Sequence, residues 1–346
     1  MAHEVENMVS TKGKVPWHGV GHVLDKELIS SEEIMNIMPE FNFTVEKRQN
    51  FTSIRRNGNT TIASNTTIAL EDSYSLIRVN PDLSESVLCG TVGRNYVPIQ
   101  NKDAFKFFDN IVGEGEAIYE TAGILKNGRI IFLVAVLPEY IKILGHENDT
   151  IRPYLLLSNW HDGTSSLRAM FTPVRVVCNN TLNMALGDNF SQVSIRHTAS
   201  AEERMYEASR LMGIVNQFSL ELNKAFNKMA LAKISSDDIV KYVNTLIPLE
   251  DGASDIVKER RENVRNSILE LVECGQGAEL ETANKTVWGA FNAFTEYVDH
   301  FEKTKTDSAR TEKLLFGSGR LRKQQAFDLA LTLADEKKPV NNIVLN

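Results

Sequence analysis

The arrangement of apolar and polar residues changes near residue 198. Before this position, short apolar runs rich in β-branched residues alternate with turn residues, a pattern typical of strands. After it, apolar residues recur at steps of three and four, as they do in helices that bury one face. We therefore predict an α+β domain over residues 1–198 and an all-α helical domain over residues 199–346.

The strongest strand pattern lies in the middle of the chain, where two successive hairpins are expected. Asn127-Gly128 separates the first two strands and supplies the two positive-φ residues of a type I′ turn. A helix pattern at residues 179–186 follows the second hairpin. The four strands are expected at residues 117–125, 130–137, 154–158 and 166–177. The fold class is therefore α+β, with an antiparallel β-meander core followed by a helix.

Shorter elements are expected before this core. The pattern predicts helices at residues 31–38 and 102–112, the second of them amphipathic. Between them, β-branched residues flank Asn57-Gly58, which predicts a hairpin over residues 51–70. Further short strands are expected at residues 74–79 and 87–92.

The helical half carries two pronounced apolar faces. Residues 205–229 form a seam that resembles a coiled coil. A helix predicted at residues 279–303 carries Trp288, Phe291 and Phe294 on one side. Because these faces exceed what one small helical domain needs, we expect a homo-oligomer.

Composition excludes several classes of protein. The chain has 38 Lys and Arg against 45 Asp and Glu, and its net charge of −7 argues against coating nucleic acid through bulk positive charge. The longest apolar run, residues 130–137, is far shorter than the roughly 20 residues of a membrane span. The N-terminus lacks the apolar segment of a secretory signal. We therefore expect no membrane partner and a cytoplasmic location.

The sequence offers little chemistry for catalysis or metal binding. The three cysteines lie far apart, which favours neither a disulfide framework nor a cysteine-rich zinc site. His18 and His22 could meet on a helix, but the glycines between them disfavour one. His161 and His197 could act as general acid or base, yet no nucleophile accompanies them. We therefore expect no metal, no cofactor and a non-enzymatic role.

Two local basic clusters could bind nucleic acid. Residues 122–198 carry seven basic against five acidic residues, and residues 303–323 carry seven against two. Arginine and helix-start amides hold phosphates, and an aromatic ring stacks a base, as single-strand binding requires. The alternative is that these side chains are ordinary solvated surface. The candidate residues are Trp160, Arg168, Arg175, Asn179, Asn180, Arg196, Lys313, Arg320, Arg322 and Lys323.

The spacing of two of these arginines sets a geometric condition. Arg168 and Arg175 are seven residues apart, so a regular strand would direct them to opposite faces. Pro173 cannot donate to a ladder of backbone hydrogen bonds. We therefore predict a break at Thr172-Pro173 that brings both arginines to one side.

Several longer motifs resemble a known family. The most specific are YVPIQNKDAF at residues 96–105, TPVRVVCNNTL at residues 172–182 and WGAFNAFTEYVDH at residues 288–300. They resemble the phage/plasmid-like protein family, classed as domain of unknown function 932. The resemblance implies a phage, prophage or plasmid protein that acts in the bacterial host cytoplasm, and it supplies no catalytic residues. An antiparallel meander with a long hairpin, followed by a helix, also resembles the core of single-strand annealing proteins.

Two functional hypotheses follow. The first is a non-enzymatic protein that binds single-stranded DNA in phage recombination or replication. The alternative is a phage interaction protein that blocks a host factor, such as an anti-phage defence component. The expected partners are accordingly single-stranded DNA or a host protein, besides further copies of the chain.

Overall fold

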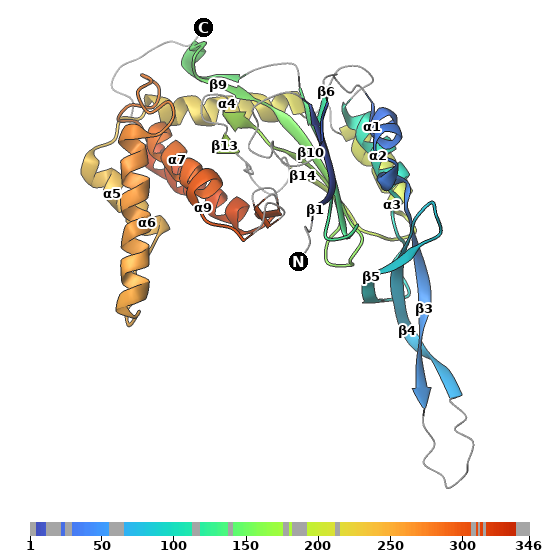
Figure 1. The fold of residues 1–346 in the computed structure, drawn as a ribbon. Coiled ribbons are helices and arrows are strands. Elements are labelled where there is room, and N and C mark those ends of the chain that lie inside the picture. The colour runs from blue at the N-terminus through green and yellow to red at the C-terminus, as the bar shows by residue number, and fades with distance from the viewer. Residues whose placement is uncertain are drawn as a thin grey trace.

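The architecture is that of a central sheet with helices on both sides and a long hairpin arm that projects from the body (Figure 1). It was obtained as a computed structural model. The structure describes residues 5–11, 22–24, 30–54, 66–112, 118–137, 141–175, 180–181, 192–211, 215–305, 309–310, 312–313 and 316–336.

The main sheet has seven strands in the order β14-β11-β10-β7-β6-β1-β2. Neighbouring strands are antiparallel except for the parallel pair β1 and β2. Its strands are β1 (Val5–Thr11), β2 (His22–Leu24), β6 (Ile118–Leu125), β7 (Ile130–Val136), β10 (Tyr154–Trp160), β11 (Leu167–Phe171) and β14 (Gln192–Ile195). The predicted α+β class with an antiparallel meander at its core is confirmed.

The turn between β6 and β7 forms as its sequence predicts. Asn127 (φ 55°) and Gly128 (φ 88°) both have positive φ, and the amide of Arg129 donates to the carbonyl of Lys126 at 3.3 Å. A type I′ turn requires positive φ at both central residues, and hairpins favour it because its twist matches that of the flanking strands. This turn therefore fixes the register of the two most deeply buried strands.

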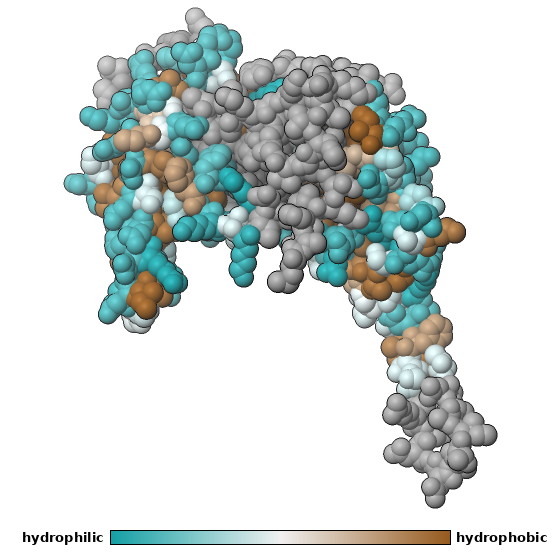
Figure 2. Space-filling model, in the orientation of Figure 1, coloured by the Kyte–Doolittle hydropathy of each residue, from teal (hydrophilic) through white to brown (hydrophobic). Residues whose placement is uncertain are grey.

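A second sheet forms the hairpin arm, with strands β3 (Thr44–Ile54), β4 (Thr66–Val79) and β5 (Glu85–Val92). It confirms the predicted hairpin, whose turn at Asn57-Gly58 lies outside the described residues. Strand β5 pairs with β4 only from Tyr74 to Val79, so the distal part of the arm is a two-stranded ribbon. Figure 2 shows the described part of this arm projecting from the body of the molecule.

A small third sheet has the order β13-β12-β9-β8. Its strands are β8 (Ile141–Lys142), β9 (Thr150–Arg152), β12 (Val174–Arg175) and β13 (Asn180–Thr181). The helix expected at residues 179–186 is wrong at Asn180 and Thr181, because these residues pair with β12 instead. Its other positions lie outside the described residues.

Helices before and directly after the meander cover one face of the main sheet (Figure 1). The Ser30 hydroxyl caps the first by accepting from the amide of Glu33 at 3.3 Å, as expected of a serine at a helix start. These helices are α1 (Ser31–Ile37), the 3-10 turn η1 (Pro39–Asn42), α2 (Asn101–Val112) and α3 (Ala201–Leu211). The helix that follows the meander within the described part is therefore α3.

The remaining helices lie beyond the other face (Figure 1). They are α4 (Val215–Leu231), α5 (Ser236–Leu246), α6 (Asp255–Cys274), α7 (Val287–Glu296), the π-helical turn η4 (Tyr297–Phe301) and α9 (Ser318–Glu336), with the short 3-10 turn η2 (Ile143–Gly145) against α4. The predicted start at residue 279 is wrong. Lys285 has positive φ (54°), and Thr286 then caps α7 by accepting from the amide of Gly289.

The apolar faces that suggested an oligomer are used inside the chain. Trp288, Phe291 and Phe294 are buried; the Phe226 ring packs against Trp288 at 4.9 Å, and the Phe327 ring packs against Phe291 at 5.9 Å. These side chains therefore give no support to self-association, and the homo-oligomer stays a prediction.

One contiguous apolar core includes side chains of the sheet part and of the helical part. Buried Asp149 joins them by accepting from the indole Nε1–H of Trp288 at 3.0 Å and from the Thr282 hydroxyl. The division between residues 198 and 199 stays a prediction. Among the described residues, no helix has both the length and the apolar character needed to cross a membrane.

Candidate nucleic-acid interface

The main sheet has two faces of different character. On β10, Leu155 and Leu157 belong to the large core beneath α2, whereas Tyr154, Leu156 and Trp160 face a smaller apolar cluster on the opposite side. Because side chains alternate along a strand, Ser158 shares the face of Trp160. This second face carries the polar residues of the candidate site.

Arg168 lies on this second face. Its neighbours Leu167 and Ala169 are buried in the large core, so alternation directs Arg168 the other way. In the ladder it lies opposite Ser158 of β10 and Ser194 of β14. The half-buried arginine therefore has two serines as its direct cross-strand neighbours.

Arg320 reaches the same place from the first turn of α9. Its Nη2 donates to Oε1 of Gln192, at the start of β14, across 3.4 Å. Burial and, to a smaller extent, the positive charge of Arg168 lower the pKa of Arg320. The two guanidinium groups therefore lie close enough to repel each other. The start of a helix adds partial positive charge at this point.

The segment before α9 positions Arg320. Nζ of Lys126, in the β6–β7 turn, forms an ion pair of 2.7 Å with Glu312. The amides of Phe316 and Gly317 donate to the carbonyl of Glu312, and the Phe316 ring packs edge-on against Trp160 at 5.8 Å. These contacts anchor the segment to the sheet immediately before the helix begins.

The surroundings of the arginine pair contain hydrogen-bond donors without acceptors. Nε of Arg168, Nε1 of Trp160 and Oγ of Ser158 are buried, and none has a hydrogen-bond partner within the described part of the chain. The arginine and indole groups can only donate. Within that same part, neither Arg168 nor Arg320 has a carboxylate at ion-pair distance. A buried donor without a partner costs about 1–3 kcal/mol, so this face is complementary to an anion with several oxygen acceptors.

The other candidates of the second basic cluster have partners within the chain. Lys313 and Arg322 both form ion pairs of 2.7 Å with Glu302. Lys323 is fully buried and pairs with Asp299 at 2.8 Å. Each of these three side chains therefore has a carboxylate partner within the chain, and Lys313 and Arg322 share theirs.

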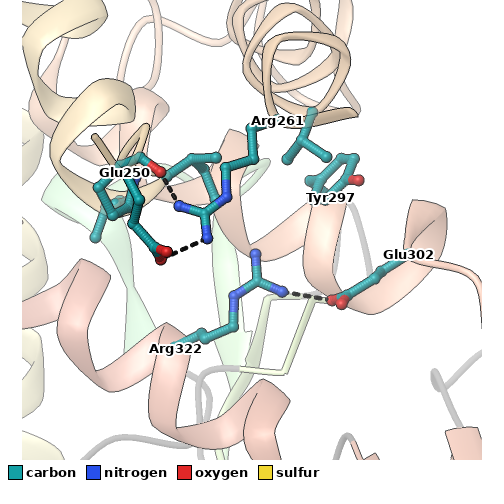
Figure 3. Close-up of a pocket in the computed structure, with 9 residues that line it drawn as sticks. Glu250, Arg261, Tyr297, Glu302 and Arg322 are labelled. Carbon is teal, nitrogen blue, oxygen red and sulfur yellow. Dashed lines mark hydrogen bonds and ion pairs between the residues drawn. The ribbon is translucent and has the colours of Figure 1, made fainter. Parts of the chain in front are cut away.

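A pocket of about 330 Å³ displays this compensation (Figure 3). Arg261 and Arg322 direct their guanidinium groups toward each other across it. Arg261 donates to Glu250 at 2.8 Å, and Arg322 donates to Glu302 at 2.7 Å. The pocket therefore holds two arginines that each already have a carboxylate partner.

The remaining candidates lie elsewhere or outside the described residues. Arg196 is exposed after β14 and lines a different pocket. Arg175 of β12 pairs with Asn180 of β13 through the backbone, and their side chains, like all of Asn179, lie outside the described residues. The predicted break is present, because β11 ends at Phe171 and the chain enters another sheet at Val174.

Three residues of the site were missed by sequence reasoning. Alternation along β10 could have revealed Ser158, which shares the face of Trp160. Gln192 and Phe316 carry no such signal, because their roles depend on where α9 meets the sheet. Within the described residues, no group of three or more His, Cys, Asp or Glu could hold a metal ion.

Fold and site together define an α+β protein with two arginines that have no carboxylate partner among the described residues, on one face of a mainly antiparallel sheet. The chain belongs to the family Domain of unknown function (DUF932), whose model matches residues 89–315. The match includes Trp160 and Arg168 and ends before Arg320. No curated protein and no solved structure matches the chain.

Proposed function

We propose that this protein binds single-stranded nucleic acid without catalysing a reaction, and that Arg168 and Arg320 together hold a backbone phosphate. The observation that carries the proposal is that the buried Nε of Arg168 on β11 has no acceptor in the described residues, while Arg320 reaches the neighbouring strand β14 at Gln192 and likewise has no carboxylate partner in those residues. A phosphate would relieve their repulsion and accept from both, because guanidinium and phosphate have matching geometry.

The partial burial of the site favours a single strand. The donors of Arg168, Trp160 and Ser158 lie on a sheet face beneath Phe316, where a rigid duplex has no access to them. A single strand can bend its backbone toward such donors, and aromatic rings beside them suit its unpaired bases. In this proposal Trp160 contributes its N–H as a donor and its ring as a surface for a base, and Phe316 contributes a second ring.

The biological setting belongs to the same proposal. Recombination or replication of a phage or plasmid fits a non-enzymatic single-strand binder in a bacterial cytoplasm, and this setting rests on the sequence resemblance described above. The net charge of −7 requires a local binding site, and an arginine pair on one face of a sheet meets that requirement.

Fluorescence anisotropy of a labelled oligothymidine at several salt concentrations tests the proposal. The double variant Arg168→Ala, Arg320→Ala should weaken binding by roughly 1–3 kcal/mol for each lost phosphate contact and lower the salt slope by about one for each. Lys102→Ala is the matched control, since it removes an exposed charge from α2, on the opposite face of the sheet. Equal binding and equal slopes for a folded double variant would refute the phosphate site.

A second function is favoured by the arm. Its ribbon exposes 59% of Phe51 on one face and 46% of Ile68 and 40% of Leu70 on the other, and exposed apolar side chains on a projecting element suit a protein partner. This supports the alternative in which the chain occupies a host factor. The variant Phe51→Ser, Ile68→Thr should then lose a host protein in pull-downs while binding oligothymidine normally. Retention of the same host protein by this variant would contradict it.

A further inference from the structure

A second cavity lies at one end of the seven-stranded sheet. Its volume is about 740 Å³, within the range of small-molecule sites. Three segments that follow strands or join them line it, residues 93–96, 163–166 and 196–198, together with Asp72 of β4. Neither arginine of the proposed nucleic-acid site is part of its lining.

His197 supplies a buried donor in this lining. The amide of Ile99 donates to its Nδ1 at 3.2 Å, which places the ring proton of the neutral imidazole on Nε2. The residue is 5% exposed, its ring stacks on Tyr96 at 4.9 Å, and Nε2 has no acceptor within the described part of the chain. Burial lowers the pKa of His197 to about 4, so the ring stays neutral near pH 7 and offers an N–H.

The charges that face His197 leave it neutral. Asp162 opposes the effect of burial on the pKa of His197, but its Oδ1 already accepts from the amide and hydroxyl of Thr164 at 3.0 and 2.6 Å. The other imidazole nearby is that of buried His161, with ring centroids 6.5 Å apart, and its pKa is lowered to about 3. The Nε2–H group therefore has no partner among the charged groups around it.

The cavity also contains hydroxyl donors and one uncompensated cation. Oγ of Ser165 is buried and has no hydrogen-bond partner within the described residues. Arg94 is neutralised by its ion pair with Asp72. Arg196 is exposed and forms no ion pair with a described carboxylate. Three residues that line the cavity, from two segments, thus carry hydrogen-bond donors, and the charge that remains among its lining residues is positive.

We infer that this cavity binds a small molecule through a phosphate group, held by the Nε2–H of His197, the Ser165 hydroxyl and the guanidinium of Arg196. A tetrahedral phosphate has several oxygens to accept from donors in different directions, and its negative charge matches Arg196. Free phosphate and the phosphate of a mononucleotide share this chemistry. The inference is independent of the proposed binding of nucleic acid by Arg168 and Arg320.

Nuclear magnetic resonance of the full chain with isotope-labelled histidine tests the inference. Inorganic phosphate and a deoxynucleoside monophosphate are titrated separately, and the Nε2–H signal of His197 should shift with saturation in at least one titration. Tighter binding of the monophosphate would identify a nucleotide as the ligand, and equal affinity would identify phosphate alone. Absence of a saturable shift with both compounds, up to millimolar concentrations, would overturn the inference.

Three variants separate this cavity from the nucleic-acid site. Arg196→Gln and Ser165→Ala should each weaken phosphate binding, by roughly tenfold or more for Arg196→Gln, because a hydrogen bond to a charged group has that strength. Arg168→Ala should leave it unchanged. Unchanged affinity in folded Arg196→Gln and Ser165→Ala would refute this site even if wild-type protein binds phosphate, and weaker binding in Arg168→Ala would assign the ligand to the other face.

Discussion

Arg261 and Arg322 face each other across a pocket, and each donates to a glutamate, whereas Arg168 and Arg320 lie together on the sheet without a carboxylate partner among the described residues. Both pairs bring two guanidinium groups together in partly buried surroundings. The first pair therefore contributes to packing within the chain, while the second forms the proposed phosphate site. Paired charges of this kind are a structural feature, and uncompensated ones indicate a binding site.

The comparison also explains why counting basic residues misleads. Lys313, Arg320, Arg322 and Lys323 lie within one short basic segment of the sequence. Three of them pair with Glu302 or Asp299, and Arg320 donates to Gln192 at the start of β14 instead. The four predictions below test this contrast, in order of decreasing effect.

Loss of the buried ion pair should have the largest effect on stability. Lys323→Met leaves the carboxylate of Asp299 buried without its cation, which costs about 3–5 kcal/mol. Urea denaturation measures the change, with exposed Lys303→Met as the matched control. If the single variant does not fold, the double variant Asp299→Asn, Lys323→Met should recover most of the stability. A loss no greater than that of the control would show that this pair resembles a surface ion pair.

Acid should destabilise the protein without acting on either arginine pair. Burial lowers the pKa of His161 to about 3 and that of His197 to about 4, from 6.5. Between these pKa values the unfolded chain therefore binds protons that the folded chain does not. The contribution of the neutral rings to the free energy of unfolding is fully present above pH 6.5 and is lost as the pH decreases from 6.5 toward 4. Between pH 7 and pH 5 the loss should be about 2 kcal/mol for each histidine.

Urea denaturation at several pH values measures this loss. The variant His146→Ala removes an exposed histidine and should leave the pH dependence unchanged. A folded His161→Phe variant should show only about half of the wild-type loss of stability between pH 7 and pH 5. A stability that stays constant from pH 7 to pH 5 would contradict the burial of both neutral rings.

Removal of Arg168, in contrast, should not lower the free energy of unfolding. Arg168→Ala removes a buried donor without a partner and the repulsion of Arg320. We expect the free protein to gain about 1 kcal/mol of stability or to remain unchanged, while its affinity for oligothymidine falls. Thermal unfolding with and without oligothymidine measures both quantities. A clear loss of stability without oligothymidine would mean that Arg168 has a structural role.

Arg322→Ala should have the smallest effect. Glu302 keeps its ion pair with Lys313 after the substitution, and the Arg322 side chain is 28% exposed. The expected loss is roughly 0.2–1 kcal/mol, as for other partly exposed ion pairs, with no change in affinity for oligothymidine. Weaker nucleic-acid binding by Arg322→Ala would remove the distinction between the two arginine pairs.

Local patterns predicted much of the fold. Alternation and the Asn127-Gly128 turn gave the two central hairpins, and the Thr172-Pro173 break follows from the missing donor of proline. The two errors have local causes that compete with helix propensity. Asn180 and Thr181 gain ladder hydrogen bonds in a small sheet, and a positive φ at Lys285 with a Thr286 cap delays α7.

Some residues of the candidate site could likewise be predicted from the sequence, and others could not. Trp160 and Arg168 could be named from the sequence, and Arg320 belonged to a basic segment whose members were indistinguishable there. Ser158 joins the site as the ladder neighbour of Arg168, whereas Gln192 and Phe316 join it only because α9 meets the sheet beside β14.

The sequence by itself determined the strand and helix pattern, the α+β class and the local excess of basic residues, because these depend on interactions between residues close in the chain. Only the tertiary structure decided which cations are neutralised, since Asp299 and Glu302 reach their partners through the packing of η4 against α9. It also decided that Trp288 and its neighbours fill a core and that the N–H of His197 has no partner in the described part of the chain. Charge compensation and burial arise from contacts between distant segments, and no local pattern encodes them.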